Sequence, residues 1–182
     1  MKQLAIALAL AGTCALSIVP STAGALETYE AISAATDAAS QARMDMIDAF
    51  GPKALAPGQY VWRDVPGNAG SERVVVSLAD QMAYLYRGNT LMAATTISSG
   101  RDSKPTPTGI FSILAKTPMY HSKKYENAAM PYAQFFDPAG VALHAGAVAR
   151  EPMSHGCVHL PIAFAKKLFT TTQVGTPVYI GA

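Results

Sequence analysis

The residues of this 182-residue chain that could carry out covalent chemistry gather near its C-terminal end. They form two short runs, His144-Ala145-Gly146 and Ser154-His155-Gly156-Cys157-Val158-His159. A thiol attacks a carbonyl carbon as the thiolate, so Cys157 needs a nearby base, and His144 can supply it if the intervening chain loops back. Gly156 lets the backbone approach a substrate closely, and the amides around Gly156 and Cys157 could face a developing oxyanion. The two runs predict a Cys–His acyl-transfer site.

The same residues allow two other interpretations. A free cysteine is often a small apolar core residue without a chemical role. Alternatively, His155, Cys157 and His159 would share one face of an extended strand and could hold a metal, with His144 or His121 as a fourth ligand. Gly156 and the following Pro161 favour a turn into a helix instead, so we expect neither a metal nor another cofactor.

The elements that position these residues are predominantly strands. Runs rich in β-branched and aromatic residues predict strands over residues 73–78, 82–87, 90–98, 110–114, 132–136, 141–144 and 176–180. Those at 73–78, 82–87 and 90–98 should form a meander. Residues 117–130 are polar and predict a long loop or flap, whereas Pro161 should open a short helix over residues 162–169. The expected fold class is mainly β.

An Ala-rich segment without Gly or Pro precedes the strands and predicts a helix over residues 26–50. Its expected apolar contacts are Tyr29, Ile32, Met44 and Ile47. Gly and Pro at 51–52 and 57–58 end the helix and mark a linker. We therefore divide the chain into a helical segment and linker at 26–58 and a domain at 59–182 with its core at 73–180. The sequence leaves open whether the helix packs on the domain or only spaces it.

Residues 1–25 have the pattern of a secretory signal peptide: Lys2, an apolar run, and Ala23-Gly24-Ala25 as the cleavage site. A retained membrane anchor and lipidation at Cys14 are the alternatives. We expect export to the periplasm or cell envelope. Cleavage would lower the formal net charge from +2 to +1 by removing Lys2, and would leave Cys157 as the remaining cysteine.

The composition excludes several classes of protein. Charged residues make up 14% of the chain, against roughly 25% in an average globular protein, and apolar residues are plentiful, so the chain is not disordered. A net charge of +2 without a block of Lys or Arg gives no footprint for nucleic acid. Two cysteines are too few for a disulfide scaffold.

The sequence resembles the YkuD-type L,D-transpeptidases over roughly residues 73–180. The resemblance rests on Val141-Ala142-Leu143-His144-Ala145-Gly146 followed by Ser154-His155-Gly156-Cys157-Val158. Further matching segments lie at 81–86, 99–100, 105–111 and 130–132. It implies the mixed β-sandwich or barrel of that catalytic domain, with one short helix after the cysteine and the N-terminal helical segment outside it.

The resemblance implies a role for each matching residue. Cys157 would be the nucleophile and His144 its base, with the imidazole oriented by the carbonyl of Ala145. Gly156 and Cys157 would supply the oxyanion amides. The expected substrate-binding residues are Ser154, His155, His159 and Tyr132, with Tyr132 lining the donor pocket under a flap at 117–130.

The implied reaction acts on peptidoglycan. Cys157 would attack the third residue of a tetrapeptide stem, expel the terminal D-alanine and form a thioester. An amine acceptor would then give a 3→3 cross-link or a wall-attached protein, whereas water would make the enzyme an L,D-carboxypeptidase. Carbapenems would acylate the same sulfur. A catalytically impaired wall-binding module and a metal-dependent hydrolase are the alternative functions.

His159 departs from the family pattern, which has Arg, or sometimes Asn, at this position. Arginine offers a permanent charge and a planar fork, whereas histidine titrates near neutral pH. His159 is therefore expected either to make a pH-dependent contact at the site or simply to pack at the helix entrance.

Overall fold

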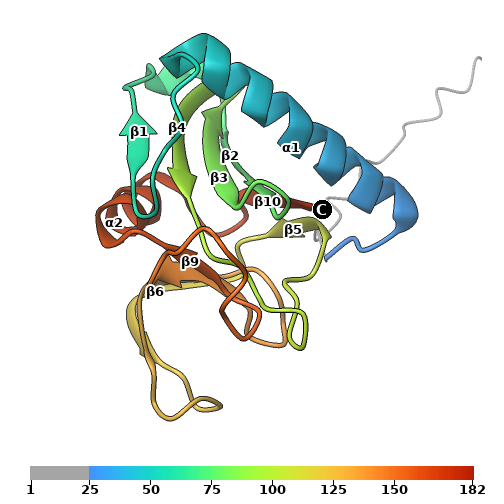
Figure 1. Ribbon diagram of the computed structural model, residues 1–182, viewed down its shortest axis with the longest axis vertical. Coiled ribbons are helices and arrows are strands. Elements are labelled where there is room, and N and C mark those ends of the chain that lie inside the picture. Colours follow the sequence, from blue (N-terminus) through green and yellow to red (C-terminus); the bar gives the residue numbers. More distant parts are fainter. Residues whose placement is uncertain (1–24) are drawn as a thin grey trace, which may run out of the picture.

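The computed structural model describes residues 25–182, which form two β-sheets and two α-helices (Figure 1). Residues 1–24, which hold nearly all of the expected signal peptide and Cys14, lie outside the described residues. Neither helix within the described range has the length and apolar character needed to cross a membrane. The mainly β class, with an N-terminal helix and a short helix after the cysteine, is confirmed.

The larger sheet has six strands in the order β1-β4-β3-β2-β10-β5. Their bounds are β1 Tyr60–Trp62, β2 Glu72–Ser77, β3 Met82–Arg87, β4 Thr90–Thr96, β5 Gly109–Ser112 and β10 Pro177–Gly181. Strands β2, β3 and β4 form the expected antiparallel meander. The last strand, β10, lies parallel to β2 and antiparallel to β5, so it joins the two halves of the sheet.

The smaller sheet has four strands in the order β6-β7-β8-β9. Their bounds are β6 Ala115–His121, β7 Ala129–Phe135, β8 Ala142–Ala145 and β9 Val158–Leu160. The expected irregular flap at 117–130 is instead a β-hairpin, because β6 and β7 pair antiparallel and only residues 122–128 form the tip. The strand expected at 132–136 overlaps the second half of β7. The polar sequence gave no sign of β6 and the start of β7, because these half-exposed segments gain their regularity from pairing with each other.

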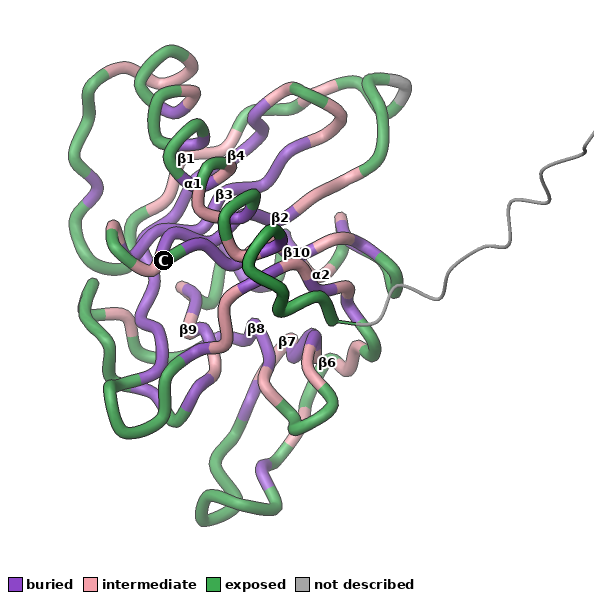
Figure 2. Tube along the Cα trace, turned by 90° about the vertical axis from the view of Figure 1, so that its right-hand side faces the viewer, coloured by how far each residue is buried: buried purple, intermediate pink, exposed green. Residues whose placement is uncertain are grey.

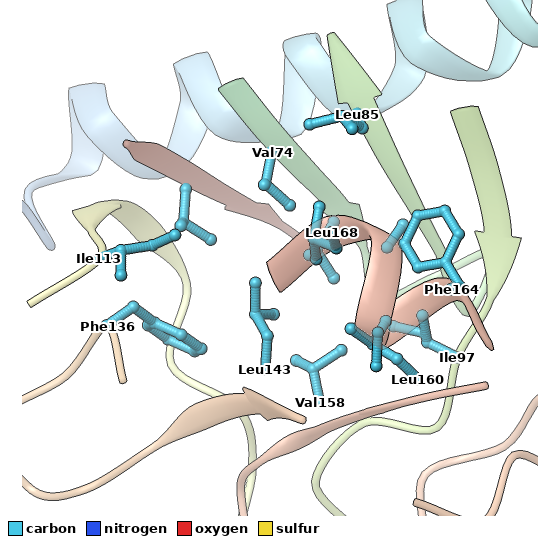
Figure 3. Close-up of a cluster of buried hydrophobic side chains, with 14 of the residues drawn as sticks. Val74, Leu85, Ile97, Ile113, Phe136, Leu143, Val158, Leu160, Phe164 and Leu168 are labelled. Carbon is cyan, nitrogen blue, oxygen red and sulfur yellow. The ribbon is translucent and has the colours of Figure 1, made fainter. Parts of the chain in front are cut away.

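Between the two sheets lies the main hydrophobic core (Figure 3). Val74 and Leu85 of the larger sheet face Leu143 and Val158 of the smaller one in this cluster. Helix α2, Ile162–Thr171, buries Phe164, Ala165 and Leu168 in the same core. Pro161 precedes α2 as its N-cap. The core therefore fixes β8, β9 and α2, which flank the predicted chemical site.

Helix α1, Tyr29–Phe50, covers the outer face of the larger sheet (Figure 1). Its buried face consists of Ala31, Ala35, Ala39, Ala42 and Met46. The expectation that Tyr29, Met44 and Ile47 make the contacts is wrong, because these side chains are 83%, 56% and 41% exposed.

Small side chains explain this choice of face. Alanines let the helix backbone approach the sheet so closely that a Cβ on Gly181 would lie 2.7 Å from the Ala35 carbonyl oxygen. Helix α1 is thus packed on the domain rather than spacing it from another attachment. Figure 2 shows the buried residues running through the central strands, with the outer side of α1 and the hairpin tip exposed.

Candidate active site

The two residues predicted to carry the chemistry come from neighbouring strands of the smaller sheet. His144 lies in β8, and Cys157 directly precedes β9, which pairs parallel with β8. Both side chains line one cavity of about 290 Å³. The fold therefore brings together two residues that lie on either side of a loop at 146–153.

His144 is held in one orientation. Its Nδ1 lies 2.9 Å from the carbonyl oxygen of Ala145, the contact expected from the resemblance. A carbonyl accepts only, so Nδ1 carries the proton and Nε2 keeps the lone pair of a base. Burial, with a smaller effect of neighbouring His159, lowers the pKa of His144 to about 4, against the opposing hydrogen bond to Ala145. The imidazole is consequently neutral at neutral pH.

Cys157 is half-buried, and its burial raises the pKa of the thiol. The backbone amide of Ala142 interacts with the sulfur and acts in the opposite direction. At neutral pH the free site therefore holds a thiol and a neutral imidazole rather than a thiolate–imidazolium pair. Attack on a carbonyl would require His144 to take the proton as the sulfur–carbon bond forms.

The turn before Cys157 is tied from within and from outside. Ser154 Oγ donates to the carbonyl of Cys157 and accepts the amide of Gly156 at 3.1 Å. Thr106 Oγ1 donates to the carbonyl of Gly156 at 2.8 Å and accepts the amide of Gly100 at 2.9 Å. Gly156 has a φ of +115°, a conformation that favours glycine. The loop that carries Thr106 thus holds the cysteine turn in place.

The expectation for the oxyanion amides needs a correction. The amide of Gly156 is already engaged by Ser154 Oγ, so it does not face the cavity as a free donor. The amide of Cys157 has no acceptor within the part of the chain that the structure describes. The Cys157 N–H is therefore free to donate to an acceptor on a bound ligand.

Two cavities meet at Cys157. The second, of about 320 Å³, extends from Cys157 towards Lys123 and Lys124 of the hairpin tip. His155 lines both cavities, and its ring stacks on Tyr125 at a centroid distance of 4.4 Å. Lys124 Nζ donates to the carbonyl of Ala139 at 2.8 Å, which fastens the tip over the second cavity. The hairpin thus covers the sulfur from one side, as expected for a flap.

His159 lies beside the predicted base rather than only at the helix entrance. The rings of His159 and His144 meet edge to face, with centroids 4.9 Å apart, and His159 lines the same cavity. Its Nδ1 lies 3.1 Å from the carbonyl of Ala147. Burial lowers the pKa of His159, so at neutral pH this position carries no positive charge. A Cβ on Gly146 would lie 2.8 Å from this ring, so glycine there makes room for it.

Comparison with known protein families identifies the chain. Residues 71–180 match the YkuD family model, described as the L,D-transpeptidase catalytic domain. The chain belongs to the L,D-transpeptidase family. The match begins after α1 and β1, so both elements lie outside the family domain. None of the curated proteins compared matches the sequence.

Solved L,D-transpeptidases share the fold. An L,D-transpeptidase from Stackebrandtia nassauensis is 25% identical, with a TM-score of 0.58 over 75% of this chain and 64% of its own. One from Mycobacterium smegmatis is 20% identical, with a TM-score of 0.58 over 62% and 59%. L,D-transpeptidase 3 from Mycobacterium tuberculosis, solved with a faropenem-derived adduct, is 19% identical, with a TM-score of 0.57 over 62% and 60%. The chain thus spans about three fifths of the length of these proteins.

Two residues that the L,D-transpeptidase resemblance implied as substrate-binding do not line the cavities at Cys157. Ser154 is buried, and its hydroxyl holds the cysteine turn. Tyr132 lines neither of the cavities at Cys157, and its ring packs on Phe169 of α2 at 5.9 Å. Its φ of +55° interrupts the alternation of β7, so its side chain does not follow the direction of Met130, two residues earlier. Met130 lines both cavities instead.

The metal-site alternative required an extended segment from His155 to His159. The turn at Gly156 breaks that extension, and the ring of His155 stacks on Tyr125. Across residues 25–182, no three His, Cys, Asp or Glu side chains are grouped so as to hold a metal ion.

Sequence reasoning missed some contributors to the site. The sequence places Thr106 in a Pro-rich motif, Met130 in a segment that matches the family, and Tyr125 in the expected flap, without indicating their contacts at the site. The signal for Thr106 was its place between two prolines, which fix the backbone around it. Nothing in the sequence indicated that Tyr125 would stack on His155, because this contact depends on how the hairpin folds over the sheet.

Proposed function

We propose that the protein is an exported L,D-transpeptidase that acts on the tetrapeptide stems of peptidoglycan through a thioester acyl-enzyme. The observation that carries the proposal is the cavity shared by Cys157 and His144, with the imidazole held by the Ala145 carbonyl. Membership of the family supports the general reaction. The finer assignment of donor, intermediate and acceptor follows from the chemistry of the site.

In the first half-reaction the sulfur of Cys157 attacks the carbonyl carbon of the third stem residue. His144 Nε2 accepts the thiol proton as the sulfur–carbon bond forms, and the Cys157 N–H donates to the oxyanion. The carbon–nitrogen bond to the terminal D-alanine then breaks, and His144 returns the proton to the leaving amine. The products are a thioester on Cys157 and free D-alanine.

In the second half-reaction an amine replaces the sulfur. The neutral amine of the acceptor attacks the thioester carbonyl, and His144 removes one of its protons as the new amide bond forms. The thiolate of Cys157 then leaves and regains that proton from His144. An amine on another stem gives a 3→3 cross-link, whereas an amine on a protein attaches that protein to the wall. Water in place of the amine would release a tripeptide stem, which is the carboxypeptidase outcome.

The two cavities at Cys157 suit a reaction with two substrates. The larger one carries Lys123 and Lys124, whose ammonium groups can attract the free carboxylates of a stem peptide. The other contains His144 and His159, so an acceptor entering there passes the base that must deprotonate it. We assign the donor to the cavity that carries Lys123 and Lys124 and the acceptor to the cavity that contains His144 and His159.

Export is part of this proposal, because peptidoglycan stems lie outside the cytoplasmic membrane. The expected signal peptide at 1–25 would deliver the domain to the periplasm. Carbapenems are expected inhibitors: the sulfur of Cys157 would open the β-lactam ring by breaking its carbon–nitrogen bond. The faropenem-derived adduct of the M. tuberculosis relative is in keeping with this expectation.

The function is tested by incubating the protein with a defined disaccharide-tetrapeptide and identifying the products by mass spectrometry. Formation of a dimer that has lost one D-alanine supports transpeptidation, and the tripeptide product alone supports carboxypeptidation. The Cys157→Ala variant serves as the control and should give neither. Retention of muropeptides on the protein without any product would support the wall-binding alternative and contradict the enzyme assignment.

A further inference from the structure

A third cavity, of about 260 Å³, lies apart from the two at Cys157. The C-terminal half of α1, residues 51–55, the start of β3 and Arg150 form its walls. Helix α1 and residues 51–55 precede the family match at 71–180. This cavity therefore belongs to the combination of elements in this chain and not to the family domain alone.

Its polar groups are mostly donors. Arg43, Lys53 and Arg150 line it, together with one acid, Asp80. Asp80 is satisfied by Arg43 at 3.1 Å and by Ser77 Oγ at 3.2 Å. Within residues 25–182, Lys53 and Arg150 have no carboxylate partner. The cavity therefore has an excess of positive charge.

The side chain of Tyr84 also lines this cavity. Tyr84 lies in β3 and is 1% exposed. The charges of Asp80, Arg43 and Arg150 act on the pKa of its hydroxyl. Within residues 25–182 its hydroxyl makes no hydrogen bond, and it is not one of the fully buried unpaired polar atoms, so it is reached from the cavity. Burial raises the pKa of Tyr84, so the group stays a neutral donor. A tyrosine hydroxyl that borders the cavity can donate a hydrogen bond to a ligand with an acceptor.

The remaining walls are apolar and comprise Met46, Ile47, Leu55 and Met82. A fitting ligand thus combines an anionic acceptor with a short apolar group. A peptide that ends in alanine has both, since its carboxylate adjoins a methyl group. A lone inorganic anion would leave the apolar wall unused.

The cavity also adjoins the loop that leads to the nucleophile. Arg150 lies in this loop with a φ of +59° and reaches the carbonyl oxygens of Leu55 and Asp80, each at 3.4 Å. On the far side of Arg150, the loop is fixed to the carbonyl of Ser99 by the amides of Met153 and Ser154, both at 2.9 Å. A ligand here would lie against the loop that separates it from the catalytic cavities.

We propose that this cavity binds the terminal D-alanine carboxylate of a second peptidoglycan stem, one that is not being acylated. Arg150 and Lys53 hold the carboxylate, the Tyr84 hydroxyl donates to it, and the methyl group lies against Met46 and Leu55. The choice of a stem as the source of the carboxylate rests on the proposed function. The cavity would thereby hold the enzyme on the wall beside its donor.

The test is an NMR titration of the Cys157→Ser protein, which cannot turn over, with N-acetyl-D-alanine. We expect saturable shifts at the backbone amides of residues 46–55 and 80–84. Arg150→Gln and Tyr84→Phe should each weaken this binding about tenfold, since each removes a hydrogen bond to a charged group. Arg101→Gln, which removes an exposed cation outside the cavity, should leave it unchanged.

Two further probes test whether binding requires the carboxylate and whether any other anion can replace it. N-acetyl-D-alaninamide lacks the carboxylate and should not bind, and inorganic phosphate should bind at least tenfold more weakly than N-acetyl-D-alanine. The proposal is overturned by shifts confined to residues 144–159, by no saturable shifts, or by phosphate binding equally well. Wild-type acylation by a tetrapeptide is measured separately, so failure of this site is distinguishable from failure of the proposed function.

Discussion

Cys157 and His144 form a neutral pair in the free protein. Burial raises the pKa of the thiol and lowers that of the imidazole to about 4, so each shift opposes the charged form of its own group. His159 adds no permanent charge that would stabilise a thiolate. The sulfur should thus be unreactive until a bound carbonyl lets its proton move to His144.

The pH dependence of alkylation tests this neutral pair. Iodoacetamide reacts with the thiolate, so the rate for Cys157 should reach half its maximum at a higher pH than the rate for N-acetylcysteine measured alongside. The measurement is the rate of mass increase across pH 6–11 in protein lacking residues 1–25. A rate that is already maximal at pH 7 would mean a preformed thiolate and would contradict the neutral pair.

Two variants at His159 provide the control for that profile. His159→Arg places a permanent positive charge beside the pair and should move the alkylation profile about one pH unit or more to lower pH. His159→Gln changes the ring without adding charge and should leave the profile close to that of the wild type. Equal shifts in both variants would show that charge at this position is not the cause.

At this scale the sequence predicted the reacting groups but not all of their surroundings. Cys157 and His144 were identified from residue type and spacing, and the Ala145 contact followed from the resemblance. Tyr132 was misplaced because a single positive φ in β7 turns its side chain towards α2. Such a local backbone irregularity leaves no trace in residue type or spacing.

The elements around the site act through a few buried hydrogen bonds. The loop carrying Thr106 and the turn before Cys157 are remote in sequence, and the Thr106 hydroxyl joins them by serving both Gly100 and Gly156. Thr106 is buried, so neither group could turn to water if the hydroxyl were lost. Thr106 is therefore one of the side chains that hold the nucleophile in position, together with Ser154.

Replacing Thr106 tests that dependence. Thr106→Val keeps the shape but leaves the Gly100 amide and the Gly156 carbonyl unpaired, which should lower the free energy of unfolding by about 1–3 kcal/mol. The acylation rate of Cys157 by a carbapenem should fall as well. The checks are urea unfolding and intact-mass kinetics.

Thr108→Val is the matched control, because Thr108 is only half-buried and its side chain makes no hydrogen bond within residues 25–182. It should leave both stability and acylation nearly unchanged. If Thr106→Val and Thr108→Val behaved alike, the Thr106 hydroxyl would not be what holds the cysteine turn.

The sequence predicted the strands whose side chains are buried in the core. It did not predict a strand whose extended backbone is held mainly by hydrogen bonds to its neighbouring strand. The runs at 73–78 and 82–87 coincide closely with β2 and β3, which are rich in buried apolar residues. Strand β6 carries polar, half-exposed residues, so its pattern indicated a loop, whereas the strand expected at 132–136 overlaps β7. Periodicity in a single sequence does not report the regularity that an exposed strand gains from pairing with its neighbour.

Over the whole molecule, α1 enlarges the family domain by a second hydrophobic layer. Ala39, Ala42 and Met46 join Val75 and Tyr84 in a cluster on the outer face of the larger sheet. Alanine is only weakly hydrophobic, so a stripe of alanines does not stand out as a buried face in the sequence. The larger Tyr29, Met44 and Ile47 were therefore predicted to make the contacts of the helix. Close approach between backbones, rather than side-chain size, determines which face of α1 is buried.

Overpacking this interface tests its role. Ala35 is fully buried against Gly181, so Ala35→Leu should lower the free energy of unfolding by about 1–3 kcal/mol. Ala34→Leu, at the exposed neighbouring position, should change stability by less than about 0.5 kcal/mol. Equal effects in urea unfolding would contradict the close packing of α1 on the sheet.

The pH dependence of global stability follows from His144. Its folded pKa of about 4 lies below the roughly 6.5 of an unfolded histidine, so between these values the unfolded chain binds more protons. The free energy of unfolding should therefore fall by about 3 kcal/mol more in the wild type than in His144→Gln between pH 6.5 and pH 4. His121→Gln, at an exposed position of β6, should keep the wild-type slope. A His144→Gln slope equal to that of the wild type would rule out His144 as the source.

The central claim is that Cys157 carries an acyl group derived from a peptidoglycan stem. The direct measurement is the intact mass of the protein after brief mixing with a tetrapeptide donor and acid quenching. We predict a mass increase equal to the donor minus D-alanine, located on Cys157 and absent from Cys157→Ala. Product formation without any such adduct in the wild type, or an equal adduct in Cys157→Ala, would contradict the account.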